Sequence, residues 1–277
     1  MIELKFTKKF EDKCFLFWSH FSVLIIVKIK YNINCQNKGE ILIMKLTKRL
    51  QYLVDAIPND ANIIDVAADH GYVALALAKK NINRQIIVND IANQPLQVAK
   101  KNFQVANFVA DFRLGSGLTV LTNNDKIDTV IIAGIGGKLL VEILEESSDK
   151  LKNINTLCLQ ANIGMALVRK WLYANKYTVT DDILIDENKH IYECIIAKKA
   201  QKSDHGYPLD KKNREIIYHF GKFITQNDPT TLKNWLSNKI IMSEKVLTQL
   251  AQTDYDHVKA KIEFHQKIIE YAKGILI

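Results

Sequence analysis

The feature that most constrains this chain is a regular alternation of apolar, β-branched runs with amphipathic stretches between residues 62 and 175. Five runs are predicted as strands: Asn62–Val66, Gln85–Asn89, Phe108–Leu114, Thr129–Ala133 and Thr156–Gln160. The other stretches have helical spacing: Tyr72–Lys80, Pro95–Val105, Gly137–Glu146 and Met165–Asn175. Runs that are apolar on both faces are typical of a parallel sheet covered by helices on its two sides, which predicts the α/β class.

A hairpin is predicted to close this sheet. Thr178–Ile185 and Ile191–Lys198 flank a turn at residues 186–189, which indicates two antiparallel strands at the sheet edge. Ahead of the first strand, apolar residues between Leu46 and Ile57 have helical spacing, and Pro58 ends that helix. Five alternating units closed by a hairpin are the arrangement of Rossmann-like class I methyltransferases, whereas a dehydrogenase would normally continue with another parallel unit. We expect this domain to cover residues 44–200.

The C-terminal part is predicted to be a helical appendage over residues 208–277. Its apolar residues form three stripes at helical spacing, and the last two indicate an antiparallel coiled-coil hairpin with its tip at Thr253–Asp256. Lys and Arg number 14 against 9 Asp and Glu over residues 198–277, but 17 against 17 over residues 44–197. A basic appendage beside a neutral core favours a polyanionic partner, although a mildly basic domain needs none.

Residues 1–43 fit neither domain. Phe15–Val27 is an apolar run of 13 residues, too short for a helix that spans a bilayer core of about 30 Å. No small-x-small cleavage site of a signal peptide follows it. Lys38-Gly39-Glu40 can be encoded as AAAGGAGAA, a ribosome-binding sequence just upstream of a start codon at Met44. We therefore expect residues 1–43 to be a non-native extension, with a membrane anchor as the alternative.

The four cysteines lie far apart, with no CxxC pair and no paired histidines. This spacing favours neither a metal site nor a disulfide framework, and a reducing, cytoplasmic environment is the default expectation. Cys158 and Cys194 lie in apolar runs and are predicted to be small core residues.

Ligands of such sheets bind at the carboxyl ends of the strands, near the point where the strand order reverses. Asp65 ends the first predicted strand and the loop 67–71 follows it, while Asp90 ends the second strand, about where an acidic residue would hold ribose hydroxyls. Gly115-Ser116-Gly117 follows the third strand and residues 133–137 follow the fourth. Glycines there let backbone amides approach a flat ring, although each could equally be a turn or a helix entry.

The chain carries a series of motifs in this order: KRL, DVAADHGYV, NDIANQPLQVAKKN, RLGSGL, DTVIIAGIGG, LQAN and IYE. From about Lys45 to the C-terminus it resembles the bacterial tRNA (adenine-22-N1)-methyltransferases. The chain departs from the family pattern at three positions: Ala67 stands where glycine is usual, Ser116 where aspartate is usual, and Ala161 where proline is usual.

The resemblance implies S-adenosyl-L-methionine as the methyl donor and adenosine N1 in tRNA as the acceptor, with no metal. It implies a set of cofactor-binding residues at the strand ends: Asp65, Ala67, His70, Asp90, Ile91, Gly115, Ser116, Gly117, Ala133 and Gly134. Two alternatives stay open, namely an RNA-binding protein that has lost catalysis and a nicotinamide-dependent oxidoreductase. The absence of a GxGxxG motif disfavours the second.

Asp69 and Tyr72 are the candidate catalytic residues. N1 of neutral adenine already has a lone pair, so positioning and electrostatics should dominate over base catalysis. We expect Asp69 to accept a hydrogen bond from the exocyclic amine and to stabilise the developing positive charge. The N1 edge is a pairing edge, so the base must be unpaired or flipped out, and Tyr72 and His70 are candidates to hold it. Alternatively, Tyr72 packs the start of its helix and His70 caps it.

Further residues are candidates for contact with the RNA. By the resemblance, Gln160 and Asn162 at the end of the fifth strand contact the target base, although turn polars need no function. Lysines interleaved with the C-terminal stripes could contact tRNA phosphates, or form a solvated face: Lys222, Lys233, Lys239, Lys245, Lys259, Lys261 and Lys267. We expect tRNA as the partner, a monomer in preference to an oligomer, and no stable membrane association.

Overall fold

The computed structural model describes residues 45–200, 214–251 and 258–277. The expected N-terminal extension over residues 1–43 and the expected hairpin tip at Thr253–Asp256 therefore lie outside the described residues. Within the described ranges, no helix combines the length and the apolar character needed to cross a membrane.

The core element is a seven-stranded sheet with the order β3-β2-β1-β4-β5-β7-β6. Its strands are β1 Ile63–Val66, β2 Ile86–Asp90, β3 Asp111–Leu114, β4 Thr129–Gly136, β5 Thr156–Ile163, β6 Tyr177–Glu187 and β7 His190–Lys199. The first five pair in parallel, and β7 pairs antiparallel with both β5 and β6. This confirms the predicted parallel sheet closed by an edge hairpin. The strand order reverses between β1 and β4, where ligands of such sheets bind.

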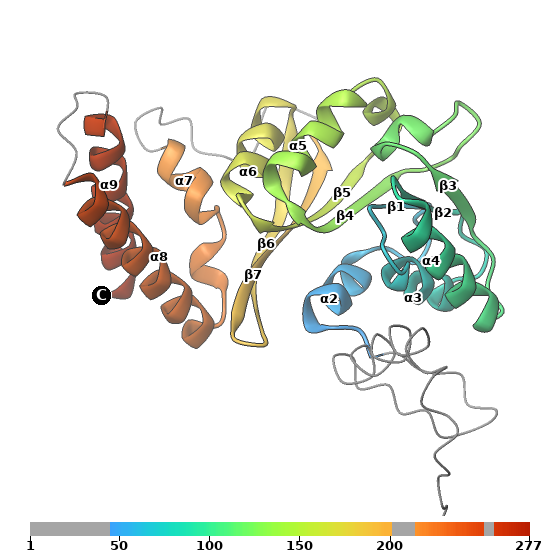
Figure 1. Ribbon diagram of the computed structural model, residues 1–277, viewed down its shortest axis with the longest axis horizontal. Helices are drawn as coiled ribbons and strands as arrows, with labels where there is room; N and C mark the ends of the chain where they lie inside the picture. Colours follow the sequence, from blue (N-terminus) through green and yellow to red (C-terminus); the bar gives the residue numbers. More distant parts are fainter. Residues whose placement is uncertain (1–44, 201–213, 252–257) are drawn as a thin grey trace, which may run out of the picture. The chain divides into compact units, whose positions relative to one another are not determined.

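Helices cover both faces of the sheet (Figure 1). They are α2 Lys48–Ala56, α3 Tyr72–Lys80, α4 Asn93–Val105, α5 Gly137–Glu146 and α6 Met165–Ala174. Successive strand residues point to opposite faces, so Ile63 and Ile131 pack with α2, α3 and α4, while Ile64 and Val130 pack with α5 and α6. This two-sided burial explains the near-continuous apolar runs in the sequence.

Three strand boundaries differ from the prediction by three residues, and the others differ by no more than two. β3 begins at Asp111 instead of Phe108, because its pairing with β2 starts where Asp111 meets Ile87. β4 and β5 run on to Gly136 and Ile163, because these two strands continue to pair through bulges beyond the point where β1 ends. The expected loop at residues 133–137 was therefore wrong, since residues 133–136 belong to β4.

The C-terminal part is helical, as predicted, with α7 Arg214–Phe220, the 3₁₀ turn η4 Ile224–Gln226, α8 Pro229–Leu250 and α9 Lys259–Leu276. Asp228 caps α8 by accepting a hydrogen bond from the Thr231 amide at 2.8 Å. Buried side chains of these helices, among them Phe220, Trp235 and Ile268, pack with Leu184 of β6. The appendage is thus anchored on the edge hairpin of the sheet, and its coiled-coil character stays a prediction.

A buried charge cluster supports this attachment. Arg169 on α6 is almost fully buried and donates two hydrogen bonds to Asp182 of β6, at 2.8 and 2.7 Å. It also contacts Glu193 of β7 at 2.8 Å and donates to the Tyr218 carbonyl of α7 at 3.1 Å. One guanidinium thus binds groups on β6, β7 and α7. These contacts fix the position of α6 relative to the hairpin and to α7.

Candidate functional site

A cavity of about 400 Å³ opens at the carboxyl ends of β1, β2 and β4. It is lined by Arg49, Leu50, Asp65, Ala67, Ala68, Asp69, His70, Tyr72, Val73, Asp90, Ala133, Gly134 and Ile135. The cavity lies at the switch point between β1 and β4, where the sequence predicted a ligand. Eight of the predicted site residues therefore meet here: Asp65, Ala67, Asp69, His70, Tyr72, Asp90, Ala133 and Gly134.

The loop 67–71 that follows β1 has an unusual backbone. Ala67, Asp69 and Gly71 have φ angles of 53°, 50° and 69°, in the left-handed region that favours glycine. Two non-glycine residues in this region within one short loop store strain, which is common at ligand sites. The loop is held because the Ala68 amide donates to the Asn89 carbonyl at 3.1 Å and the Gly71 amide donates to the Ala68 carbonyl at 2.8 Å.

Two buried carboxylates lie behind this loop. Asp65 accepts a hydrogen bond from the Ala74 amide at 3.3 Å, and burial, reinforced by nearby Asp90, raises the pKa of Asp65 to about 7. Asp90 accepts hydrogen bonds from the Ala92 amide at 2.9 Å and from the Asp69 amide at 3.2 Å. Asp90 thus fixes the loop, and its remaining lone pairs are available to hydroxyl donors of a ligand.

Asp69, His70 and Tyr72 form a second group beside the cavity. Asp69 Oδ2 lies 2.7 Å from His70 Nδ1, and the carboxylate is otherwise exposed. The His70 and Tyr72 rings are stacked, with centroids 5.4 Å apart and an interplanar angle of 8°. The expectation that His70 could cap α3 was wrong, because the N-cap of α3 is Gly71 and no side chain caps it. The group offers a carboxylate next to a flat aromatic surface.

The opposite side of the cavity is set by Gly134, which has a φ of 84° at the bulge in β4. Gln160 accepts a hydrogen bond from the Gly134 amide at 3.0 Å, and Asn162 donates to the Gly134 carbonyl at 2.7 Å. Gln160 and Asn162 both lie within β5, so the alternative that they are turn residues was wrong, and their expected contact with the target base stays a prediction. Their side chains fix the backbone of Gly134, and Gln160 is completely buried.

Arg49 of α2 is a cavity residue that the sequence analysis did not single out. It donates to Gln160 Oε1 at 2.7 Å, pairs with Glu187 at 3.4 Å and lies over the Tyr192 ring at 5.1 Å. These contacts place a guanidinium at the edge of the cavity. In the sequence, only the KRL motif pointed to Arg49. Its place at the cavity could not be predicted, because its partners Gln160, Glu187 and Tyr192 lie far along the chain.

Four predicted cofactor residues do not line this cavity. Ile91 is exposed after β2. Gly115, Ser116 and Gly117 form a turn that leads into the 3₁₀ helix η2 Gly117–Val120, in which Ser116 Oγ lies 3.3 Å from Glu146. The Gly115 amide donates to the Asp90 carbonyl at 3.0 Å, so this turn still supports the strand end that carries Asp90.

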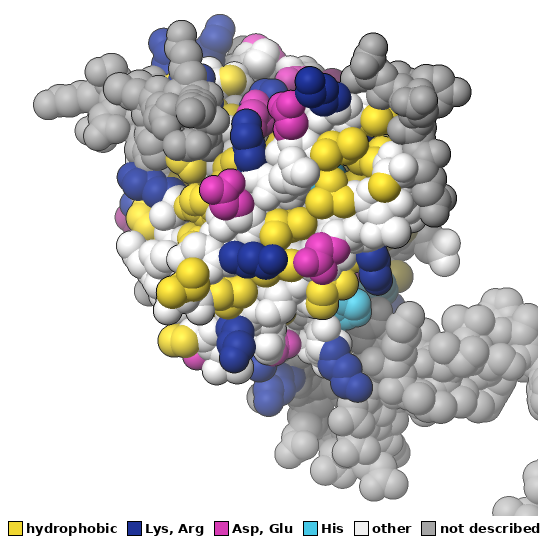
Figure 2. All heavy atoms as spheres, turned by 90° about the vertical axis from the view of Figure 1, so that its left-hand side faces the viewer, with side chains coloured by type: hydrophobic (Ala, Val, Ile, Leu, Met, Phe, Trp, Pro, Cys, Tyr) yellow, Lys and Arg dark blue, Asp and Glu magenta, His cyan; other side chains and the backbone are white. Residues whose placement is uncertain are grey.

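The predicted RNA-binding lysines are mostly exposed. Lys222, Lys233, Lys245, Lys259, Lys261 and Lys267 are exposed on the C-terminal helices or the segments between them. Lys239 differs, because it is partly buried, lies 4.5 Å from the centroid of the Trp235 ring and pairs with Glu193 at 3.5 Å. Figure 2, which views the α8 and α9 side, shows Lys and Arg dispersed among acidic and apolar side chains.

Within the part of the chain that the structure describes, no cluster of His, Cys, Asp and Glu has the arrangement of a metal site.

Comparison with known proteins is consistent with this geometry. Over 237 residues, which cover 84% of this chain and 98% of the relative, the chain is 28% identical to the tRNA (adenine(22)-N(1))-methyltransferase of Bacillus subtilis. The crystal structure of the B. subtilis m1A22 tRNA methyltransferase matches with a TM-score of 0.72 at 28% identity, covering 84% of this chain and 99% of that one.

A second solved structure is TrmK of M. capricolum in complex with the cofactor product S-adenosyl-homocysteine. It matches with a TM-score of 0.70 at 26% identity and covers 83% of this chain and 99% of that one. The family described as "methyltransferase domain" matches residues 46–195, the segment that holds the sheet and the cavity. With more than half of its length matched, this chain belongs to the methyltransferase domain family.

Proposed function

We propose that this chain transfers a methyl group from S-adenosyl-L-methionine to N1 of adenosine 22 in tRNA. The observation that carries the proposal is the cavity at the switch point, where buried carboxylates lie behind an exposed carboxylate and an aromatic stack. The similarity to the B. subtilis tRNA (adenine(22)-N(1))-methyltransferase extends over most of both chains and supports the substrate.

The residues of the cavity fit the cofactor. Asp90 offers carboxylate lone pairs to the ribose hydroxyls, and Arg49 offers a cation to the carboxylate of the methionine part. Asp65 adds a buried carboxyl group to the wall of the cavity, which would favour a ligand that carries positive charge. When bound, the cofactor supplies an activated methyl group on a sulfonium. The protein's part is to hold that group in line with the acceptor atom.

The Asp69 group suits the target base. An adenine whose pairing edge is free can lie against the stacked rings of His70 and Tyr72. Asp69 then accepts a hydrogen bond from the exocyclic amine and stabilises the positive charge that develops on the ring as N1 is methylated. The contact of 2.7 Å between Asp69 and His70 holds the carboxylate in place, so little reorganisation is needed during the reaction.

The exposed lysines of the C-terminal helices bind the rest of the tRNA. Their dispersed positions suit contacts with the sugar-phosphate backbone, which set position and affinity without reading sequence. A monomer provides all the residues invoked for catalysis. Since tRNA is found in the cytoplasm, the proposal also places the protein there.

Methylation of a defined transcript tests this proposal. Unmodified tRNA with adenosine 22 is incubated with the protein and S-adenosyl-L-methionine, and the position of 1-methyladenosine is mapped by mass spectrometry. We expect one methyl group at N1 of adenosine 22 and none in a transcript with guanosine 22. Cofactor binding without methylation of any tRNA would instead support an RNA-binding protein that has lost catalysis.

A further inference from the structure

Three exposed aliphatic side chains lie at the same edge of the sheet as the cavity. They are Leu139 in the first turn of α5, Ile163 at the end of β5 and Leu167 in the first turn of α6, and they are 50%, 77% and 48% exposed. We refer to these three residues as the rim patch. None of them has a role in the core or in the cavity described above.

The backbone brings these three residues together. Ile163 pairs with Gly136 of β4, and a Cβ on Gly137 would lie only 2.4 Å from the Gly164 carbonyl oxygen. The N-termini of α5 and α6 therefore begin side by side (Figure 1). Leu167 follows within one turn, since its amide donates to the Gly164 carbonyl at 3.0 Å. Only glycine at position 137 permits this close approach.

The backbone beside the rim patch is open at Gly136, the residue of β4 that pairs with Ile163. A Cβ at Gly136 would meet nothing within 4 Å, so open space lies next to Ile163. Single exposed aliphatic residues are normal, but a group of them beside a binding site indicates an interaction surface.

The rim patch is continuous with the cavity. Gly134 and Ile135 line the cavity and immediately precede Gly136, while Asn162 bonds the Gly134 carbonyl and immediately precedes Ile163. An RNA chain that delivers a base to the Asp69 group across the Gly134 side of this opening would run past the rim patch. Methylation at N1 requires the target adenosine to leave its stack, and its neighbours then lose stacking as well. Apolar side chains placed against such unstacked bases recover part of that loss.

We propose that the rim patch binds an unstacked nucleobase adjacent to the target adenosine, an RNA contact within the catalytic domain and separate from the C-terminal lysines. This inference rests on the proposed function, because it requires an RNA substrate. It identifies Leu139, Ile163 and Leu167 as residues that hold the RNA close to the methylated position, while the cavity holds the cofactor.

Two variants remove the surface in different ways. Ile163→Ser combined with Leu167→Ser replaces exposed apolar groups, and both positions face solvent, so the fold keeps its core. Gly136→Gln leaves the three residues of the patch unchanged and adds a polar side chain at the position that pairs with Ile163, where the φ of −77° and ψ of 145° are allowed for any residue. Ile82→Ser is the matched control, since Ile82 is 73% exposed in the loop ahead of the amino end of β2, at the opposite edge of the sheet.

The test is a double-mutant cycle that combines changes in the protein with changes in the RNA. Single-turnover methylation and tRNA affinity are measured for each protein with unmodified tRNA and with transcripts that carry an abasic site next to adenosine 22. We expect the double serine variant and Gly136→Gln to bind intact tRNA about tenfold more weakly, as for the loss of one aliphatic contact with a base. Their affinity for the cofactor should equal that of the wild type and of Ile82→Ser.

The abasic site supplies the decisive comparison. In the wild type, one of the two flanking abasic sites should weaken binding about as much as the protein variants do, and it should cause no further loss in those variants. Additive losses, or a double variant that binds intact tRNA as tightly as Ile82→Ser does, would overturn the inference. A change in oligomeric state in the double variant would overturn it too, by assigning the patch to a second copy of the chain. Wild-type methylation of intact tRNA reports on the proposed function separately, since it does not depend on the variants.

Discussion

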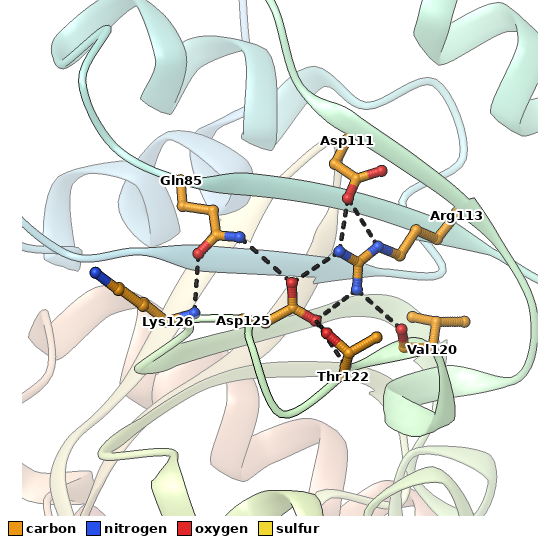
Figure 3. Close-up of polar contacts among 7 residues, drawn as sticks. All are labelled: Gln85, Asp111, Arg113, Val120, Thr122, Asp125 and Lys126. Atoms are coloured by element: carbon orange, nitrogen blue, oxygen red, sulfur yellow. Dashed lines mark hydrogen bonds and ion pairs between the residues drawn. The ribbon is translucent and has the colours of Figure 1, made fainter.

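Carboxylates gather at both ends of strand β2, and the two groups are held in opposite ways. Near its amino end, Asp111 and Asp125 surround Arg113 of β3, which lies 2.6 Å from each of them (Figure 3). Thr122 donates two further hydrogen bonds to Asp125, and Gln85 joins the network at 3.4 Å. The hydrogen bonds from Arg113 hold the pKa of Asp125 well below its usual range.

At the carboxyl end of β2, Asp90 and the neighbouring Asp65 face the cavity without such a partner. Among the ion pairs of the described residues, none includes Asp65 or Asp90, and both accept hydrogen bonds from backbone amides instead. Burial raises the pKa of Asp65 to about 7, the opposite direction from Asp125.

The contrast separates a structural cluster from a binding site. In the Arg113 cluster, the protein satisfies its own charges, and the result is a fixed connection between β3 and the segment before β4. In the cavity, carboxylates are left for a ligand to satisfy, at a cost to the stability of the free protein.

The largest expected effect is the contribution of Asp65 to the pH dependence of the free energy of unfolding. Since its pKa is raised in the folded protein, its contribution to stability is fully present below its ordinary value of 3.8 and is lost as the pH rises through about 7. An asparagine side chain cannot ionise, so Asp65→Asn should gain about 3 kcal/mol of unfolding free energy relative to the wild type between pH 4 and 8. Urea unfolding of both cofactor-free proteins over this range measures the difference, and a difference independent of pH would contradict the account.

Breaking the structural cluster should affect stability alone. Arg113→Met leaves the nearly buried Asp125 without its cation, which should lower the unfolding free energy at pH 7 by about 2 kcal/mol. Cofactor affinity measured by calorimetry should not change. Asp111→Asn is the control, because Asp111 is half-exposed and its removal leaves the Arg113–Asp125 pair in place. Weaker cofactor binding in Arg113→Met would show that the two groups are not independent.

The converse holds for Asp90. Asp90→Ala removes charge-assisted hydrogen bonds to the cofactor and should weaken its binding by about 1.5 kcal/mol, or roughly tenfold. Titration calorimetry with S-adenosyl-L-methionine provides the measurement. An unchanged dissociation constant would remove Asp90 from the binding site, whereas the Asp111→Asn protein should bind as the wild type does.

The smallest effect concerns the strained loop. Ala67 has a φ of 53°, so Ala67→Gly relieves strain and should stabilise the folded protein by about 0.5 kcal/mol, after the larger backbone entropy of glycine in the unfolded chain is subtracted. Ala68 does not have a positive φ, and Ala68→Gly should destabilise the protein by about 0.5–1 kcal/mol. Thermal unfolding of the two variants measures both changes in stability. Changes of the same sign would contradict backbone strain at Ala67.

Much of this arrangement could be predicted from local patterns. The apolar runs give the strands, and residues that follow strand ends, such as Asp65, Asp69 and Asp90, meet because parallel strands end at one edge. Contacts that depend on distant partners could not be predicted in this way. The glycine-rich stretch after Ile132 suggests a loop, yet pairing with β5 extends β4 through it. Arg49 reaches the cavity edge only because the β6–β7 hairpin folds back beside α2.

The central claim is that the exposed carboxylate of Asp69 beside the cavity acts in methyl transfer, while the carboxylates of the Arg113 cluster do not. The most direct test is single-turnover transfer from labelled S-adenosyl-L-methionine to unmodified tRNA by the wild type, Asp69→Asn and Asp111→Asn. The account predicts that Asp69→Asn retains cofactor and tRNA affinity but reacts at least about tenfold more slowly, while Asp111→Asn keeps the wild-type rate. A wild-type rate in Asp69→Asn, or an equal loss in both variants, would contradict it.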